Sequence, residues 1–327
     1  MAIIGPGMTF IMSGLSVSIY WIGAYLIYEA AMINRMTIFS DMVVFTSYAM
    51  QVVMSFVMVS IIFIMLPRVA VSAKRVLEVL ETKVNITDGT KIEGKPGMIG
   101  DIEFKNVSFT YPDSEQPTLR HISFRAKKGE TVAFIGSTGS GKTSIINLIP
   151  RFYDVSEGEV LVDGVNVKDY KQEALHDKIG YVSQTAVLFS GTITSNVSYG
   201  ENDQTGESIK AVKQAVEIAQ GKDFVEKFDG QYDGHIAQGG TNVSGGQKQR
   251  LSIARAIYRK PEIYIFDDSF SALDYKTDRA LRQALKKETE NATTLIVAQR
   301  IGTIKDADQI IVLEDGEIVG KGTHEQL

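Results

Sequence analysis

Two adjacent aspartates end an apolar segment of the sequence, in "IYIFDDSF" at residues 263–270. Carboxylates at the end of a buried strand are suited to organising a divalent metal ion and its water beside a phosphate group. A second apolar run, "LIVAQRIGTI", carries Gln299 shortly after its strand-like part. Asp267, Asp268 and Gln299 are therefore candidates for metal and phosphate chemistry.

A glycine-rich segment supplies the partner for such chemistry. "GSTGSGKT" at 136–143 matches G-x-x-x-x-G-K-[ST], and it lies between an apolar stretch at 131–135 and a helical stretch at 144–149. Glycines let successive backbone N–H groups point at phosphate oxygens, and the helix N-terminus adds its positive dipole end. Lys142 would reach the β- and γ-phosphates, and the Thr143 hydroxyl would bind Mg²⁺. The predicted nucleotide-binding residues of this segment are Gly136, Ser137, Thr138, Gly139, Ser140, Gly141, Lys142, Thr143 and Ser144.

A second helix N-terminus of this kind follows in "NVSGGQKQR" at 242–250. Ser244, Gly245 and Gly246 offer a hydroxyl and exposed N–H groups ahead of a helix that begins near Gln247. One nucleotide needs only one such cradle. The second is more useful for a nucleotide held by another copy, which predicts a face-to-face pair of domains.

On these motifs the sequence resembles the ATP-binding cassette (ABC) transporters of the exporter type, in which membrane helices are fused ahead of the cassette. The resemblance implies ATP and Mg²⁺ as cofactors, with Asp267, Thr143 and Gln184 at the metal. Tyr111, in "FTYP", would stack on adenine, and Gln184, in "YVSQTAVLFSGTI", would relay the nucleotide state to the membrane domain. Asp274, in "SALD", would lie at the contact between two cassettes.

Two residues depart from the pattern of efficient members of that family, which carry Glu and His where this chain has Asp268 and Gln299. A general base must come within about 2.6–3.2 Å of the attacking water, and Asp is one methylene shorter than Glu. Misplacement by about 1 Å can cost on the order of 10²-fold in rate. Gln299 is a neutral amide that cannot carry positive charge. Asp268, Gln299 and Gln184 form the predicted catalytic set, in a site expected to bind ATP and to hydrolyse it slowly. The alternative, for either substitution alone, is sequence drift that the protein tolerates.

The composition bounds the possible partners. The chain of 327 residues has a net charge of −5, no cysteine, and no Lys/Arg cluster of the kind that follows a phosphate backbone, so we expect no nucleic-acid partner. Residues 1–28 and 42–67 contain no charged residue, and each run is long enough to cross a hydrocarbon core of about 30 Å as a helix. Buried core helices of a soluble protein are the alternative.

Basic residues follow the second run at Arg68, Lys74 and Arg75, which predicts that this side is cytoplasmic and that the turn at 29–41 lies outside. The predicted fold class is an α/β P-loop NTPase domain, an ABC cassette, preceded by an α-helical transmembrane hairpin. Three parts are predicted. Residues 1–67 form two transmembrane helices, the last part of an exporter membrane domain, and residues 68–100 form a cytoplasmic helix and linker. Residues 101–327 form a nucleotide-binding domain whose C-terminus is expected to be truncated.

The resulting hypothesis is the ATP-binding and ATPase subunit of an exporter of drugs or lipid-like compounds, multi-pass in the cell membrane with a cytoplasmic cassette. Its expected partners are a second ABC half-transporter in a heterodimer, membrane lipid, and a small-molecule export substrate. The alternatives are a soluble ABC-type ATPase and a nucleotide-sensing regulatory module without transport activity.

Overall fold

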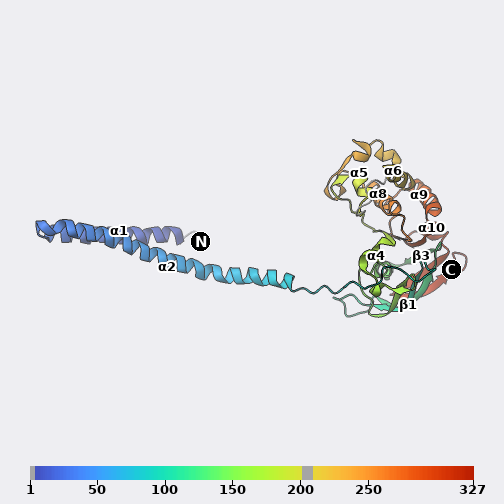
Figure 1. Ribbon diagram of the computed structural model, residues 1–327, viewed down its shortest axis with the longest axis horizontal. Coiled ribbons are helices and arrows are strands. Elements are labelled where there is room, and N and C mark those ends of the chain that lie inside the picture. Colours follow the sequence, from blue (N-terminus) through green and yellow to red (C-terminus); the bar gives the residue numbers. More distant parts are fainter. Residues whose placement is uncertain (1–3, 201–208) are drawn as a thin grey trace. The chain divides into compact units, whose positions relative to one another are not determined.

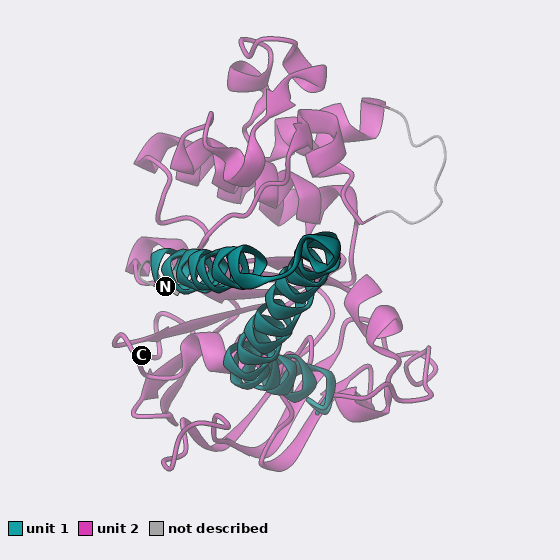
Figure 2. Cartoon of the chain, turned by 90° about the vertical axis from the view of Figure 1, so that its left-hand side faces the viewer, with its two compact units in different colours: residues 1–85 teal, residues 86–327 magenta. Residues whose placement is uncertain are grey.

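A computed structural model describes residues 4–200 and 209–327. The chain divides into two compact units, and the boundary between them in the sequence lies between Asn85 and Ile86. Figure 2 colours the N-terminal unit teal and the C-terminal unit magenta. Residues 1–3 of the first predicted membrane span lie outside the described part of the chain.

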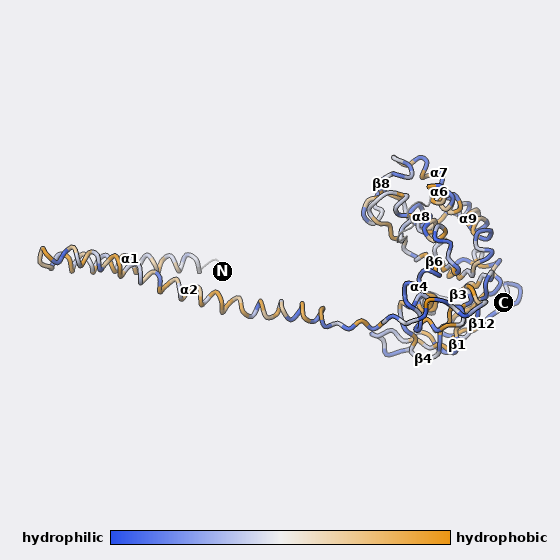
Figure 3. Tube along the Cα trace, in the orientation of Figure 1, coloured by the Kyte–Doolittle hydropathy of each residue, from blue (hydrophilic) through white to orange (hydrophobic). Residues whose placement is uncertain are grey.

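The N-terminal unit consists of two long helices, α1 (Ile4–Glu29) and α2 (Arg35–Leu80), joined through a short 3₁₀ turn at Met32–Asn34. Large apolar side chains point away from both helices: Phe10, Trp21, Phe56 and Phe63 are between 71% and 81% exposed. Figure 3 shows hydrophobic residues (orange) along α2. Both helices are long and apolar enough to cross a membrane.

The turn and the end of the second helix differ from what the sequence predicts. The turn is limited to the residues between Glu29 and Arg35, because helix α2 starts well before Asp41. The predicted cytoplasmic helix after Pro67 is not a separate element, since α2 continues through Pro67 to Leu80. Proline removes one N–H donor from a helix, and a helix of this length retains enough neighbouring bonds to pass through it.

The C-terminal unit is built on two sheets. The first has the order β2-β1-β4-β5 and its paired strands are antiparallel; the second has the order β12-β11-β3-β10-β9-β6 and is parallel except for its edge strand β12. The strands of these sheets are β1 (Ile102–Phe109), β2 (Leu119–Ala126), β3 (Thr131–Gly136), β4 (Glu157–Val162), β5 (Val165–Asn166), β6 (Ile179–Val182), β9 (Ile263–Asp267), β10 (Thr293–Val297), β11 (Gln309–Glu314) and β12 (Glu317–Gly322).

The parallel sheet has a hydrophobic core on each face, because successive side chains of a strand point to opposite sides. On β9, Ile263 and Ile265 belong to the core shared with the antiparallel sheet, whereas Tyr264 and Phe266 belong to the core shared with the helices. Strands buried on both faces explain the unbroken apolar runs in the sequence. The parallel-sheet α/β domain predicted from the alternation of strands and helices is confirmed.

Helices cover the cassette unequally. Figure 1 shows α5, α6 and α8 grouped at one end of the unit, away from β1, while α3 lies in the core between the two sheets. The helices of this unit are α3 (Lys142–Leu148), α4 (Gln172–Asp177), α5 (Ile193–Val197), α6 (Ile209–Ile218), α7 (Lys222–Val225), α8 (Gly245–Tyr258), α9 (Tyr275–Glu288) and α10 (Ile301–Ile304). A small hairpin of β7 (Gly191–Thr192) and β8 (His235–Ile236) joins the helical end.

The segment that follows α2 is attached to the cassette. Gly89 N donates to Tyr170 O over 2.9 Å, and Lys91 both donates to Asp169 O and accepts from Lys171 N, each over 2.8 Å. The buried Arg151, just after α3, donates from Nη1 to Thr87 O over 2.9 Å. The part of the predicted linker from Ile86 onward therefore belongs to the C-terminal unit.

Candidate functional site

A pocket of about 310 Å³ opens between the phosphate loop and the carboxyl ends of β9 and β10. Ligands of parallel α/β sheets bind at this end of the strands, where loops from neighbouring strands meet. The residues that line the pocket are Thr118, Thr138, Gly139, Gly141, Lys142, Thr143, Ser144, Gln184, Asp267, Asp268, Val297 and Gln299. The structure thus brings together residues from the phosphate loop, the Gln184 segment and both strand ends.

The phosphate loop has a shape that its glycines permit. Gly141 lies at φ 97°, the left-handed region that favours glycine, directly before α3. A Cβ on Gly136 would come within 2.2 Å of Leu313 O, so only glycine fits there. Lys142 Nζ donates to Gly136 O over 2.9 Å and to Ser137 O over 2.7 Å, which folds the loop around the ammonium group. Burial lowers the pKa of Lys142, and the nearby Asp267 and Asp268 oppose that shift.

Asp267 and Thr143 form the part of the pocket suited to a metal ion. Thr143 Oγ1 donates to Asp267 Oδ1 over 3.1 Å, so the hydroxyl and the carboxylate that the sequence assigns to Mg²⁺ are adjacent. Burial raises the pKa of Asp267, and the hydrogen bond from Thr143 works against it. Oxygen donors of this kind are the ligands that Mg²⁺ prefers, and Gln184 can add an amide oxygen. The chemistry of the donor set fits Mg²⁺ held together with substrate phosphates.

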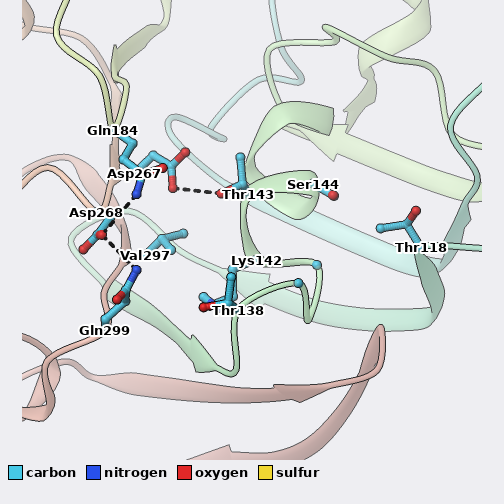
Figure 4. A pocket seen from close by; sticks show the side chains of 12 residues that line it. Thr118, Thr138, Lys142, Thr143, Ser144, Gln184, Asp267, Asp268, Val297 and Gln299 are labelled. Carbon is cyan, nitrogen blue, oxygen red and sulfur yellow. Dashed lines mark hydrogen bonds between the residues drawn. The ribbon is translucent and has the colours of Figure 1, made fainter.

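Asp268 is held by two amides at one of its oxygens. Gln299 Nε2 donates to Asp268 Oδ2 over 3.1 Å, and Gln184 Nε2 approaches the same oxygen at 3.4 Å (Figure 4). The backbone of Asp268 lies at φ 44° and its N–H donates to Val297 O over 2.9 Å, which fixes where the short side chain starts. The three residues predicted as catalytic are therefore neighbours, with both glutamines hydrogen-bonded to Asp268.

Tyr111 lies beside the pocket residue Ser144, and Asp274 is not among the residues that line the pocket. Tyr111 is not among the residues that line the pocket; its hydroxyl is 3.0 Å from Ser144 Oγ, and its ring packs edge-on against Tyr153. Asp274 caps α9 by accepting from Thr277 N over 3.0 Å.

The second predicted anion-binding group starts helix α8. Ser244 N donates to Gln247 Oε1 over 2.8 Å and Gln247 N donates back to Ser244 Oγ, which is a capping box. Ser244, Gly245, Gly246 and Gln247 do not line the pocket. Two of the four, Ser244 and Gly245, are exposed.

The pocket also contains residues that the sequence does not single out. These are Thr118, directly before β2, and Val297, the last residue of β10. The sequence could have indicated Thr118, because it follows Tyr111 by a few residues and directly precedes an alternating strand. Val297 looks like any other buried strand residue and could not have been identified.

Comparison with known proteins agrees with this geometry. A family model described as "ABC transporter" matches residues 119–271. An ABC transporter ATP-binding protein of Mycobacterium tuberculosis is 40% identical over 328 aligned residues, covering 100% of this chain and 55% of the relative. The protein YfiB of Bacillus subtilis, also an ABC transporter ATP-binding protein, is 40% identical over 98% of this chain and 54% of its own length. The chain therefore spans about half the length of these relatives.

Two further matches extend the likeness. The ATP-dependent lipid A-core flippase of Escherichia coli is 43% identical over 228 residues, 70% of this chain and 39% of that protein. The solved structure of a bacterial Atm1-family ABC exporter with ATP bound has a TM-score of 0.73 and 31% identity, over 88% of this chain and 50% of that one. Fold, pocket and relatives agree, and the chain belongs to the ABC transporter family.

Proposed function

We propose that this chain is the ATP-binding part of an ABC exporter subunit whose own nucleotide site hydrolyses slowly. The N-terminus of α8, from Ser244 to Gln247, then serves the nucleotide of a second, different half-transporter. When bound, Mg²⁺ would supply charge neutralisation at the phosphates, with Thr143, Asp267 and Gln184 as its protein ligands.

One observation carries the proposal: the residues expected to bind phosphate and metal lie together, whereas the carboxylate expected to act as the base is hydrogen-bonded to two glutamines. Lys142, Thr143 and Asp267 lie together at the phosphate loop, whereas Asp268 Oδ2 accepts from both Gln299 and Gln184. A carboxylate that acts as a general base must reach the attacking water. Two amides hold Oδ2 of Asp268, and the side chain is one methylene shorter than that of Glu, so its carboxylate reaches less far.

The N-terminal helices support a membrane location. They are apolar, long and exposed along most of their length, and Arg68, Lys74 and Arg75 in the later part of α2 support a cytoplasmic cassette under the positive-inside rule. We infer a multi-pass protein of the cell membrane. Its export substrate is a drug or lipid-like compound, a class supported by the flippase among its relatives.

A nucleotide-sensing module without transport is the second candidate, and the pairing of Asp268 with Gln299 is the observation that favours it. The two candidates differ in whether ATP binding here supports export. Purification of the protein from membranes, with and without a co-expressed half-transporter that carries Glu and His at the matching positions, separates the two candidates.

In that experiment, ATP turnover and dye efflux are measured in proteoliposomes. The exporter proposal expects efflux only from the pair, and expects Ser244→Ala in this chain to reduce turnover in the partner's site. Rapid ATP turnover by this chain paired with itself would contradict the slow site. Efflux that is unchanged when Lys142→Ala removes ATP binding here would contradict the need for this chain's nucleotide.

A further inference from the structure

A buried glutamine of helix α8 holds the Gln184 segment from outside the pocket. Gln249 is 2% exposed, and its Nε2 donates to Ser183 O over 3.2 Å. Ser183 is the residue directly before Gln184, and Gln249 follows the capping residue Ser244 by little more than one turn. One amide therefore connects the pocket's glutamine with the helix that starts at the second anion-binding group.

The strand before Gln184 is bonded on its other sides as well. Tyr181 OH donates to Asn147 Oδ1 over 2.9 Å, which ties β6 to the phosphate-loop helix α3. Burial raises the pKa of Tyr181, so its hydroxyl stays protonated and able to donate. Ser269 Oγ donates to Val182 O over 2.9 Å from the turn that holds Asp268. Three successive residues thus contact α3, the end of β9 and α8.

We propose that Gln249 is a positioning residue that couples nucleotide binding in the Lys142 pocket to the N-terminus of α8. The proposal rests on the proposed function, in which that N-terminus acts on a nucleotide of another subunit. Gln184 approaches Asp268 only at 3.4 Å, so this contact is the one easily exchanged when Mg²⁺ and ATP enter the pocket. Movement of Gln184 displaces Ser183 O, and the buried amide of Gln249 transmits the displacement to α8.

Hydrogen exchange on the full chain in detergent, with and without MgATP, tests this coupling. In the wild type, MgATP should slow exchange at 136–144 and also at 244–251. In Gln249→Met, which keeps the length of the side chain but removes the donor, slowing at 136–144 should persist. Slowing at 244–251 should fall by about two- to tenfold, the range to which one hydrogen bond corresponds.

Matched variants separate coupling from a merely structural role. Lys248→Met removes a neighbouring bond of α8, from Lys248 Nζ to Gly239 O at 2.8 Å, and should leave the MgATP effect unchanged. If Gln249→Met does not fold, Gln249→Asn draws the same amide back by one methylene and should give the same loss. A wild-type MgATP effect at 244–251 that survives in these Gln249 variants would overturn the coupling alone.

The proposed function fails in a different way. Absence of any MgATP effect at 136–144 in the wild type, or an effect there that Lys142→Ala does not remove, would overturn ATP binding and the coupling with it.

Discussion

Gln299 Nε2 donates to Asp268 Oδ2 over 3.1 Å, so the two residues that depart from the family's pattern are hydrogen-bond partners. A neutral amide and a carboxylate satisfy each other without a water between them. The two departures therefore form one unit rather than two independent changes, which bears on how the site can be repaired.

Repair of the site should need both residues. Asp268→Glu alone is expected to raise ATP turnover only slightly, because Gln299 still carries no charge. Asp268→Glu with Gln299→His should raise turnover by about 10²-fold, since both the reach of the carboxylate and the charge return. The measurement is phosphate release by the chain reconstituted in lipid.

The control for that experiment is Asp229→Glu, the same substitution at an exposed position, which should change nothing. Full-speed hydrolysis by the unmodified chain, lost in Asp268→Ala, would show that Asp268 is an adequate base and that the site is not slow.

Lys142 is expected to carry ATP affinity. Its Nζ is already surrounded by Gly136 O and Ser137 O, so a bound phosphate would complete a preformed cationic site. Lys142→Ala should weaken ATP binding at least about tenfold, as expected for a charge-assisted bond, whereas the exposed Lys128→Ala should not. Titration with a fluorescent ATP analogue measures both, and equal affinities would place the nucleotide elsewhere.

Much of the site could be predicted from the sequence because its motifs are local. The phosphate loop fixes its own backbone through glycines, and Asp267 ends a strand whose apolar run identifies it, so Lys142, Thr143 and Asp267 could be placed together. The bond between Asp268 and Gln299 could not be predicted, because it depends on the rotamers of two side chains that follow different strands. Gln249 was missed for the same reason: burial of an amide is not visible in "SGGQKQR".

Some features of the fold could likewise be predicted from the sequence, and others could not. The parallel sheet follows from apolar runs that alternate with helices, whereas the continuation of α2 through Pro67 does not, since a proline after a span resembles a helix end in sequence. The docking of the segment from Ile86 onward depends on Arg151 and Tyr170, which lie far along the chain and give no local signal.

As the pH is lowered, the contribution of Mg²⁺ to ATP binding should be lost at a higher pH than an ordinary aspartate ligand would give. Burial raises the pKa of Asp267 above its ordinary value of 3.8, and a protonated carboxyl is a poor metal ligand. The Mg²⁺-dependent gain in ATP affinity should therefore fall as the pH drops through that raised pKa. Asp267→Asn should show little gain at any pH, and a gain that persists down to the ordinary value would contradict the role of Asp267.

The same shift has a consequence for stability without nucleotide. The folded state binds a proton at Asp267 at a higher pH than the unfolded chain does, so the free energy of unfolding should decrease as the pH rises between the two pKa values. Asp267→Asn should remove this slope. Denaturation at several pH values between these limits measures it, and an unchanged slope in the variant would assign it to other carboxyls.

Removal of Arg151 should lower the stability of the cassette more than removal of an exposed arginine of the same unit. It is 6% exposed, and it joins Asp154, Thr87 O and Lys168 O through bonds of 2.8, 2.9 and 3.1 Å. Arg151→Met leaves two carbonyl groups without this donor and should lower the free energy of unfolding by about 2–4 kcal/mol. Arg120→Met is the matched control, since the guanidinium of Arg120 pairs with Glu317 at 3.9 Å on the surface and its loss should lower the free energy of unfolding by less than about 1 kcal/mol.

The readout for Arg151 must come from the cassette, and the single tryptophan, Trp21, lies in α1. Near-ultraviolet circular dichroism of the cassette's tyrosines during thermal unfolding is therefore the suitable measurement. Because Arg151 holds Thr87, the variant should also expose the segment after α2 to proteases at temperatures where the cassette is still folded. Equal losses in Arg151→Met and Arg120→Met, or a segment that stays protected, would show that the attachment of this segment does not depend on the Arg151 guanidinium.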